Sequence, residues 1–97
     1  MLAELMREHQ RQVILRLLSE DSGYDLNESI LHDGINAMGL DISRDGLRTQ
    51  LAWLVEQGLI TLSAIGNIQL AHLTSRGLDV ATGRARVPGI KRPSPTN

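Results

Sequence analysis

The sequence predicts a small, mainly α-helical domain with one β-hairpin, in the order helix, helix, helix, hairpin, helix. Apolar residues repeat at helical spacing over residues 43–57, and Gly58 follows them directly. Two short alternating runs then flank a Gly-Asn turn within residues 60–73. A chain of 97 residues forms one domain with a real but small core.

The third of these helices has the clearest signals. Ser43 is an expected N-cap, because its hydroxyl can accept from a free backbone N–H of the first turn. Gly58 is expected to end the helix in the left-handed conformation. The buried stripe, at spacings i, i+4 and i+7, consists of Leu47, Leu51 and Leu54.

The other helices are placed by similar signals. Asn27 caps a second helix, which Gly39 ends, and residues 24–26 before it form a short extended link. Thr74 caps a last short helix over residues 75–81.

The first helix is expected over residues 2–19. Its polar side contains Arg7, Glu8, Arg11 and Arg16. Its apolar side contains Leu2, Leu5, Met6, Val13, Leu17 and Leu18. The N-terminal turns carry more apolar surface than one small domain needs to cover, so we expect a homodimer that uses Leu2, Leu5 and Met6.

Charge is distributed unevenly along the chain. Residues 84–97 contain four basic residues and no acid, whereas residues 1–83 contain six arginines and eleven acids. We therefore expect a folded domain over 1–83 and a basic, proline-containing mobile tail over 84–97. The basic residues of the tail are Arg84, Arg86, Lys91 and Arg92.

Composition excludes several classes of function. The chain has no cysteine, which excludes disulfides and thiolate metal sites. No apolar run approaches a membrane span, and the N-terminus is not a signal peptide, so we expect a cytoplasmic protein. His9, His32 and His72 lie on three different elements, and no catalytic or phosphate-loop signature is present. We expect no metal, no cofactor and no enzymatic activity.

Residues 43–60 (SRDGLRTQLAWLVEQGLI) and 73–77 (LTSRG) resemble the winged helix-turn-helix superfamily, in which a third helix leads into a hairpin called the wing. The resemblance covers residues 1–83. Together with residues 27–29 and 76–93, these segments are also similar to small proteins of Mu-like phages and prophages described as putative ArsR-like regulators. This resemblance implies a winged helix without a defined activity. It does not imply metal sensing, because the cysteines that such sensors use are absent.

Helix-turn-helix proteins read DNA with the N-terminal residues of this third helix. Here these residues are Ser43, Arg44, Arg48 and Thr49. Either arginine could contact a phosphate or a guanine. The alternative is that both arginines are solvated or pair with Asp41 or Asp45. Two acids, Asp45 and Glu56, on the outward face of the helix favour that alternative.

The hairpin and the tail supply the remaining predicted DNA contacts. Asn67 is the candidate at the hairpin tip. Residues 59–74 contain no lysine or arginine, which favours the alternative that the hairpin is only a structural lid on the third helix. The tail could bind phosphate without sequence preference, keep the chain soluble, or dock on an acidic protein. Trp53 could anchor an interface or close the core.

These observations predict a small phage- or prophage-type protein that binds double-stranded DNA as a regulator or accessory factor. The alternative is a protein-interaction or dimerisation scaffold in phage genome handling or assembly, which would bind another phage protein. The two differ in whether Arg44 and Arg48 are free on one surface continuous with the tail, or are held in ion pairs while Trp53 lies in an exposed apolar patch.

Overall fold

A computed structural model of the chain describes residues 1–93. It contains four helices, α1 (Leu2–Glu20), α2 (Glu28–Ala37), α3 (Arg44–Glu56) and α4 (Ser75–Ala81). Its three strands are β1 (Asp25–Asn27), β2 (Ile60–Ile65) and β3 (Ile68–Leu73). The order of helices and hairpin is the predicted one, and the predicted caps are formed. Asn27, Ser43 and Thr74 each accept a hydrogen bond from a backbone N–H in the first turn of their helix.

The three strands form one antiparallel sheet in the order β1-β3-β2. β2 and β3 are the predicted hairpin, and Ile65 pairs with Ile68 across the turn. The extended link before α2 becomes a third strand because Asp25–Asn27 pair with Leu70–His72 of β3. The prediction of a hairpin alone therefore missed one strand, whose pairing depends on a segment more than forty residues away.

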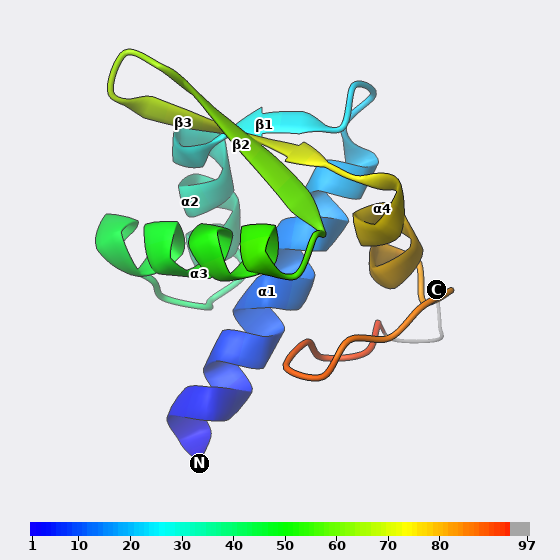
Figure 1. Cartoon of the computed structure of the whole chain (residues 1–97). Helices are drawn as coiled ribbons and strands as arrows, with labels where there is room; N and C mark the ends of the chain where they lie inside the picture. Colours follow the sequence, from blue (N-terminus) through cyan, green and yellow to red (C-terminus); the bar gives the residue numbers. More distant parts are fainter. Residues whose placement is uncertain (94–97) are drawn as a thin grey trace.

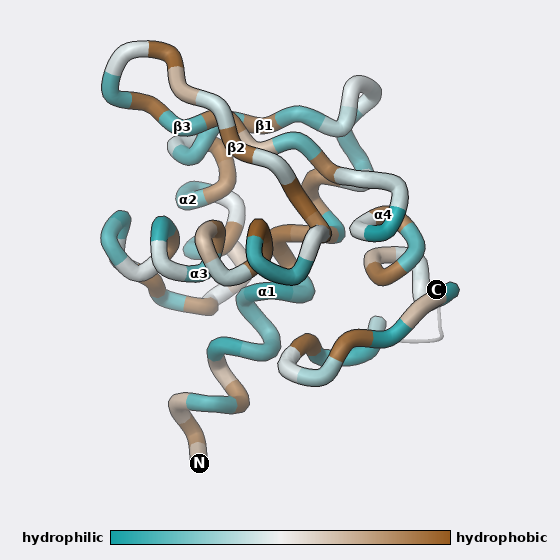
Figure 2. The backbone as a smooth tube through the Cα atoms, in the orientation of Figure 1, coloured by the Kyte–Doolittle hydropathy of each residue, from teal (hydrophilic) through white to brown (hydrophobic). Residues whose placement is uncertain are grey.

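Helix α1 is the central element of the fold. Its middle part is buried on every side, including the polar residues from Gln10 to Gln12. Figure 1 shows α1 passing behind α3 and beside α4, with its N-terminal turns extending beyond the other helices. In the tube of Figure 2, apolar segments meet where α3 runs into β2 and face α1. The core residues of α1 are Val13, Ile14, Leu15 and Leu18.

The start of α4 packs very closely on the connection between α3 and β2. A Cβ atom on Gly77 would lie 2.0 Å from the carbonyl oxygen of Leu59, so this position requires glycine. The backbone N–H of Thr74 donates to the same carbonyl (3.0 Å). The glycine of the LTSRG segment is thus explained by packing, independently of any function.

Residues 84–93 form a C-terminal strap that lies across α1 and the end of α3 (Figure 1, orange to red). Val87 is buried, and Ile90 is half-buried against the core. The N–H of Lys91 donates to the carbonyl of Glu8 (3.2 Å), and Arg11 Nη1 donates to the carbonyl of Gly89 (2.9 Å). The prediction of a mobile tail is wrong for these residues, because their apolar contacts and hydrogen bonds offset the entropy cost of ordering. Residues 94–97 of the predicted tail lie outside the described residues.

The strap also corrects the prediction for Arg11. We expected this side chain on the polar side of the first helix, but it is buried. Its Nε donates to Gln50 Oε1 (2.7 Å), and its guanidinium lies 4.0 Å from the ring centroid of Trp53. Because α3 and the strap enclose the middle of α1, a position that faces solvent in an isolated helix becomes an interior one.

Candidate nucleic-acid interface

The N-terminal end of α3 is organised around a buried carboxylate, that of Glu28. Glu28 is the first residue of α2 and is fully buried. Arg48 donates to both of its oxygens, from Nε to Oε1 (2.8 Å) and from Nη2 to Oε2 (2.7 Å). The backbone N–H of Gln69 in β3 donates to Oε2 (2.6 Å). One carboxylate thus joins α2, α3 and the hairpin.

Arg44 and Arg48 both lie over this carboxylate, and both remain partly accessible. Their side chains are 45% and 42% exposed. Arg44 Nη1 lies 3.5 Å from Glu28 Oε1, and Arg44 Nη2 donates to Ser29 Oγ (3.2 Å). Arg48 Nη2 also donates to the carbonyl of Asn67 at the hairpin tip (2.8 Å). The structure therefore brings together Arg44, Arg48 and Asn67, three of the predicted DNA contacts.

The charge of this cluster is fixed at neutral pH. The pKa of Glu28 is lowered to about 2, chiefly by the hydrogen bonds from Arg48. Burial raises this pKa, but the hydrogen bond from the Gln69 amide and the positive charges of Arg48 and Arg44 lower it further. The same contact with Glu28 raises the pKa of Arg48. Two positive charges and one negative charge therefore persist at every physiological pH.

The ion pair leaves hydrogen-bond donors unused. A guanidinium carries five N–H groups. Arg48 uses those of Nε and Nη2, and no residue of the described chain accepts from its Nη1. Arg44 makes one hydrogen bond, to Ser29. Because both side chains are about half exposed, the remaining donors are available to an outside acceptor.

The prediction from the sequence paired these arginines with the wrong acids. The alternative prediction paired them with Asp41 or Asp45, which are exposed and make no ion pair with either arginine in the described chain. Glu28 was interpreted only as a favourable charge at a helix N-terminus. It lies 16 and 20 residues from the two arginines, and no local spacing rule connects positions that far apart.

The other predicted contacts at this end are engaged locally. Ser43 Oγ accepts from the N–H of Gly46 (2.9 Å), as a cap should, and Thr49 Oγ1 donates to the carbonyl of Asp45 (3.2 Å). Both residues are exposed beside the arginines. At the hairpin tip, Ile65 is 67% exposed, so the hairpin itself exposes an apolar side chain, and no cationic one, beside Asn67.

The four basic residues of the strap lie away from Arg44 and Arg48. The strap contacts Trp53, nine residues beyond Arg44 and so about 13 Å further along the axis of α3. Three of the four basic residues line a cavity of about 760 Å³ between the end of α4 and the strap, and these are Arg86, Lys91 and Arg92. Arg84 follows Gly83 at the start of the strap and donates its N–H to Asp79. The basic segment and the arginines of α3 therefore do not form one continuous surface.

The predicted interface residues are divided between two places. Trp53 is half-buried between the Arg11 guanidinium and Gly89 of the strap, where it closes the core. Leu2 and Leu5 are 71% and 56% exposed at the start of α1, and Met6 is half-buried beside them. An apolar surface is thus present on α1, but Trp53 is not part of it.

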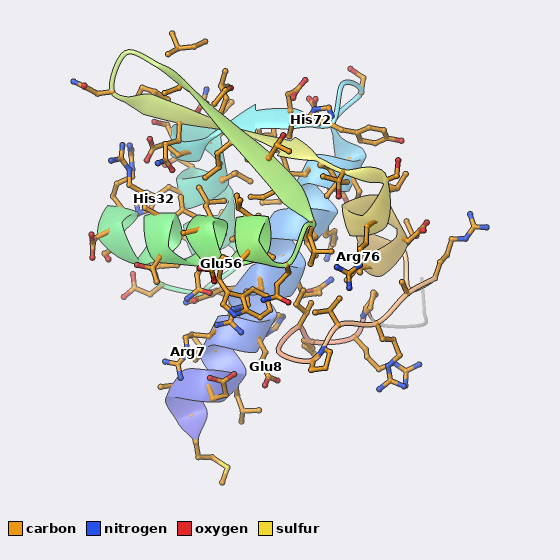
Figure 3. The ribbon with its side chains drawn as sticks, viewed as in Figure 1. Arg7, Glu8, His32, Glu56, His72 and Arg76 are labelled. Carbon is orange, nitrogen blue, oxygen red and sulfur yellow. The ribbon has the colours of Figure 1, made fainter. Side chains whose placement is uncertain are left out.

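The histidines lie apart, as their positions in the sequence imply. His72 Nδ1 lies 2.6 Å from Asp25 Oδ1, and His32 Nε2 contacts the carbonyl of Ile42 (2.9 Å). Figure 3 shows these two rings on different elements, one in the sheet and one beside α3. Within residues 1–93, no group of three or more histidines and acids is placed to hold a metal ion. None of the helices described there is long and apolar enough to cross a membrane.

Two proteins are similar to the chain over nearly their whole length. The chain is 48% identical over 95 residues to "Uncharacterized protein gp26" of Escherichia phage Mu, which covers 98% of both chains. It is 46% identical over 95 residues to an "Uncharacterized protein" of Haemophilus influenzae, which covers 97% of this chain and 92% of the relative. No protein-family model matches the chain. Identities near one half over nearly complete lengths show common descent, and the chain therefore belongs to the family of phage Mu gp26.

Proposed function

We propose that this phage-type chain is a winged-helix protein that binds double-stranded DNA through the N-terminal end of α3 and the tip of the β2–β3 hairpin, as a regulator or accessory factor. The element order and the three-stranded sheet β1-β3-β2 support this assignment of the fold. In this arrangement α3 would enter the major groove and the hairpin would be the wing.

The observation that carries the proposal is the pair of arginines held by the buried carboxylate of Glu28. The bidentate ion pair fixes the direction of Arg48, and the contacts with Ser29 and Glu28 fix Arg44. A fixed side chain loses less conformational entropy when a phosphate or a base binds it. The unused donors on both guanidinium groups supply the hydrogen bonds for that acceptor.

The charges around the cluster predict weak and salt-dependent binding. Two exposed acids, Asp41 and Asp45, lie close to it in the sequence, and residues 59–74 contribute no lysine or arginine. Two phosphate contacts correspond to a slope of about −1.8 in a plot of log affinity against log salt concentration. A change from 50 to 200 mM salt should therefore weaken binding by about tenfold.

Binding of a fluorescent 20-base-pair duplex, followed by anisotropy from low to physiological salt, tests the proposal. Substitution of Arg48 itself would leave the Glu28 carboxylate buried without its partner and would destabilise the fold, so a loss of DNA binding could not be distinguished from unfolding. Thr49→Glu instead adds an exposed acid beside both arginines and leaves the ion pairs intact. We expect it to weaken binding at least fivefold. The matched control is the double variant Arg84→Ala, Arg86→Ala in the strap, which should change binding less than twofold.

Three outcomes are informative. Loss of binding in Thr49→Glu alone supports recognition by α3. Loss in the strap variant alone would make the strap a nonspecific phosphate anchor and would exclude α3 as the contact surface. Absence of binding by the unaltered chain even at low salt would exclude the DNA-binding proposal altogether.

A second candidate function, a protein-interaction scaffold in phage genome handling or assembly, is favoured by a different observation. Ile65 is exposed at the hairpin tip, and Leu2 and Leu5 are exposed on α1, so two elements present apolar side chains to a protein partner. If the duplex does not bind, capture of phage proteins on the immobilised chain, compared with a Leu5→Glu variant, tests this candidate.

A further inference from the structure

We propose that the cavity between the end of α4 and the strap binds an organic phosphomonoester, with the phosphate group on its basic residues and the organic group on its apolar wall. This site is separate from the N-terminal end of α3, and a ligand there does not require the proposed DNA binding. The size of the cavity, the residues that line it and their charges all support such a ligand.

The cavity has the size and the lining of a small-molecule site. Its volume of about 760 Å³ lies within the range of about 300–1,000 Å³ that is typical of ligand pockets. Such pockets combine an apolar wall with a few polar groups that orient the ligand. Here the apolar wall includes Val80 of α4 and Val87 and Ile90 of the strap. Figure 1 shows the strap continuing from α4 and turning back toward α1.

The charges around the cavity all have one sign. Among the described residues that line it, three are basic, namely Arg86, Lys91 and Arg92, and none is acidic. All three are exposed, so their charged groups can turn toward the mouth of the cavity. Positive charges that gather at one concave site attract an anion.

These three basic residues differ from the arginines of the rest of the chain in their lack of an acidic partner. Of the six arginines in residues 1–83, five lie 3.9 Å or less from a carboxylate oxygen. Within residues 1–93, no ion pair involves Arg86, Lys91 or Arg92. A bound anion would supply the missing negative charge and reduce the repulsion among three like charges.

A phosphate group matches these charges better than a carboxylate does. A phosphomonoester carries a charge of about −1.5 to −2 at pH 7, whereas a carboxylate carries a single negative charge. The planar guanidinium groups of Arg86 and Arg92 can each donate two parallel hydrogen bonds to phosphate oxygens. Phenyl phosphate is a suitable probe, because its ring can cover the apolar wall while its phosphate meets the basic residues.

A titration of the isotope-labelled full chain with phenyl phosphate, followed through the backbone amide NMR signals, tests the proposal. We expect saturable shifts for amides of the strap, such as those of Val87 and Ile90, at concentrations that leave the amides of Arg44 and Arg48 unchanged. Inorganic phosphate should bind at least about fivefold more weakly, because it has no group to cover the apolar wall.

Substitutions in the strap test the role of the charges. Arg86→Gln and Arg92→Gln should each weaken the binding of phenyl phosphate at least about fivefold. The matched control is Arg84→Gln, which removes the same charge from the strap at a residue that is not among those lining the cavity. It should change the affinity less than about twofold at physiological salt. The amide spectra of the three variants verify that each one folds.

The pKa of His9 gives a second readout. Burial and the positive charge of Lys91 lower this pKa. A phosphate bound beside Lys91 offsets that charge, so the pKa of His9 should rise when phenyl phosphate saturates the cavity. An unchanged pKa would mean that the anion does not lie beside Lys91 and would overturn the assigned site.

Other results would also overturn the proposal. These are the absence of saturable shifts in the strap, shifts confined to α3, and a loss of affinity in Arg84→Gln as large as that in Arg86→Gln. A trinucleotide with a terminal phosphate distinguishes two sources of the phosphomonoester. Binding as tight as that of phenyl phosphate supports the phosphorylated end of a nucleic-acid strand, and weaker binding supports a small free molecule.

Discussion

Replacement of Glu28 by glutamine should destabilise the fold strongly, because one buried carboxylate holds three elements together. It accepts two hydrogen bonds from Arg48 and one from the backbone of Gln69. Glutamine keeps the shape but removes the charge, and its amide N–H groups face the donors of Arg48. The variant therefore loses the ion pair and gains a contact between donors.

The magnitude follows from the pKa of this group. The pKa of Glu28 is about 2 in the folded chain, against 4.5 for the ordinary carboxyl. A difference of about 2.5 units corresponds to about 3 kcal/mol, and water around the half-exposed arginines reduces this to about 2 kcal/mol. For a domain of this size the midpoint of thermal unfolding should fall by roughly 8–16 °C.

The dependence on pH identifies the cause. A carboxyl whose pKa is lowered by folding stabilises the folded chain fully at any pH above the pKa that it has in the unfolded chain. This stabilisation is lost as the pH falls through the pKa of the folded chain. The difference in the free energy of unfolding between the original chain and Glu28→Gln should therefore be constant above about pH 5. It should disappear as the pH falls toward 2. Urea unfolding, followed by circular dichroism from pH 7 to pH 2, measures it.

The matched control is Glu20→Gln. The Glu20 carboxylate is mostly exposed and pairs with Arg16 at 3.3 Å. The free energy of unfolding should therefore fall by less than about 0.5 kcal/mol. The reasoning would be refuted if Glu28→Gln cost no more than this control, or if its cost persisted unchanged at pH 2.

Two further predictions concern close contacts of glycine residues. Gly77→Ala places a Cβ atom against the Leu59 carbonyl, and the free energy of unfolding should fall by more than about 2 kcal/mol in a urea titration. Gly89→Val adds a side chain at a residue with φ +96°, whose Cβ would lie 3.0 Å from the ring of Trp53. It should lift the strap, so that the tryptophan fluorescence shifts to longer wavelength while the far-UV circular dichroism stays helical.

Each of these variants has a control in the same chain. Gly23→Ala, where a Cβ would meet its nearest atom at 3.5 Å, should be nearly neutral, and a similar loss for both alanine variants would contradict the packing explanation. Pro88→Ala should leave the emission of Trp53 unchanged. An unshifted emission in Gly89→Val would mean that the strap does not cover the tryptophan.

Local signals predicted the helices well because each boundary depends on residues close in sequence. The caps at Asn27, Ser43 and Thr74 need only a side-chain oxygen and an N–H two or three residues later, and all three are formed. The strap could not be predicted in the same way. Prolines and basic residues suggest disorder, and its order depends on Val87 and on Arg11, which lies 78 residues from Gly89.

The sequence predicted that Arg44 and Arg48 lie on the same side of one helix, but not which residue holds them. The helical spacing placed Arg44 and Arg48 on one side of α3, where the structure has them. Neither the depth of Glu28 nor its bond with the amide of Gln69 has a signal in the local sequence, because burial at that position results from the packing of α2 against α3 and β3.

The central position of α1 has a consequence for synthesis of the chain. Helix α1 emerges from the ribosome before the segments that cover it, including Val80 of α4 and Val87 of the strap. At about 5–20 residues per second, the leucines and isoleucines of α1 wait several seconds for these partners. The core is therefore completed only after residue 87 has been translated, and a ribosome stalled before residue 80 would carry a chain with an open core.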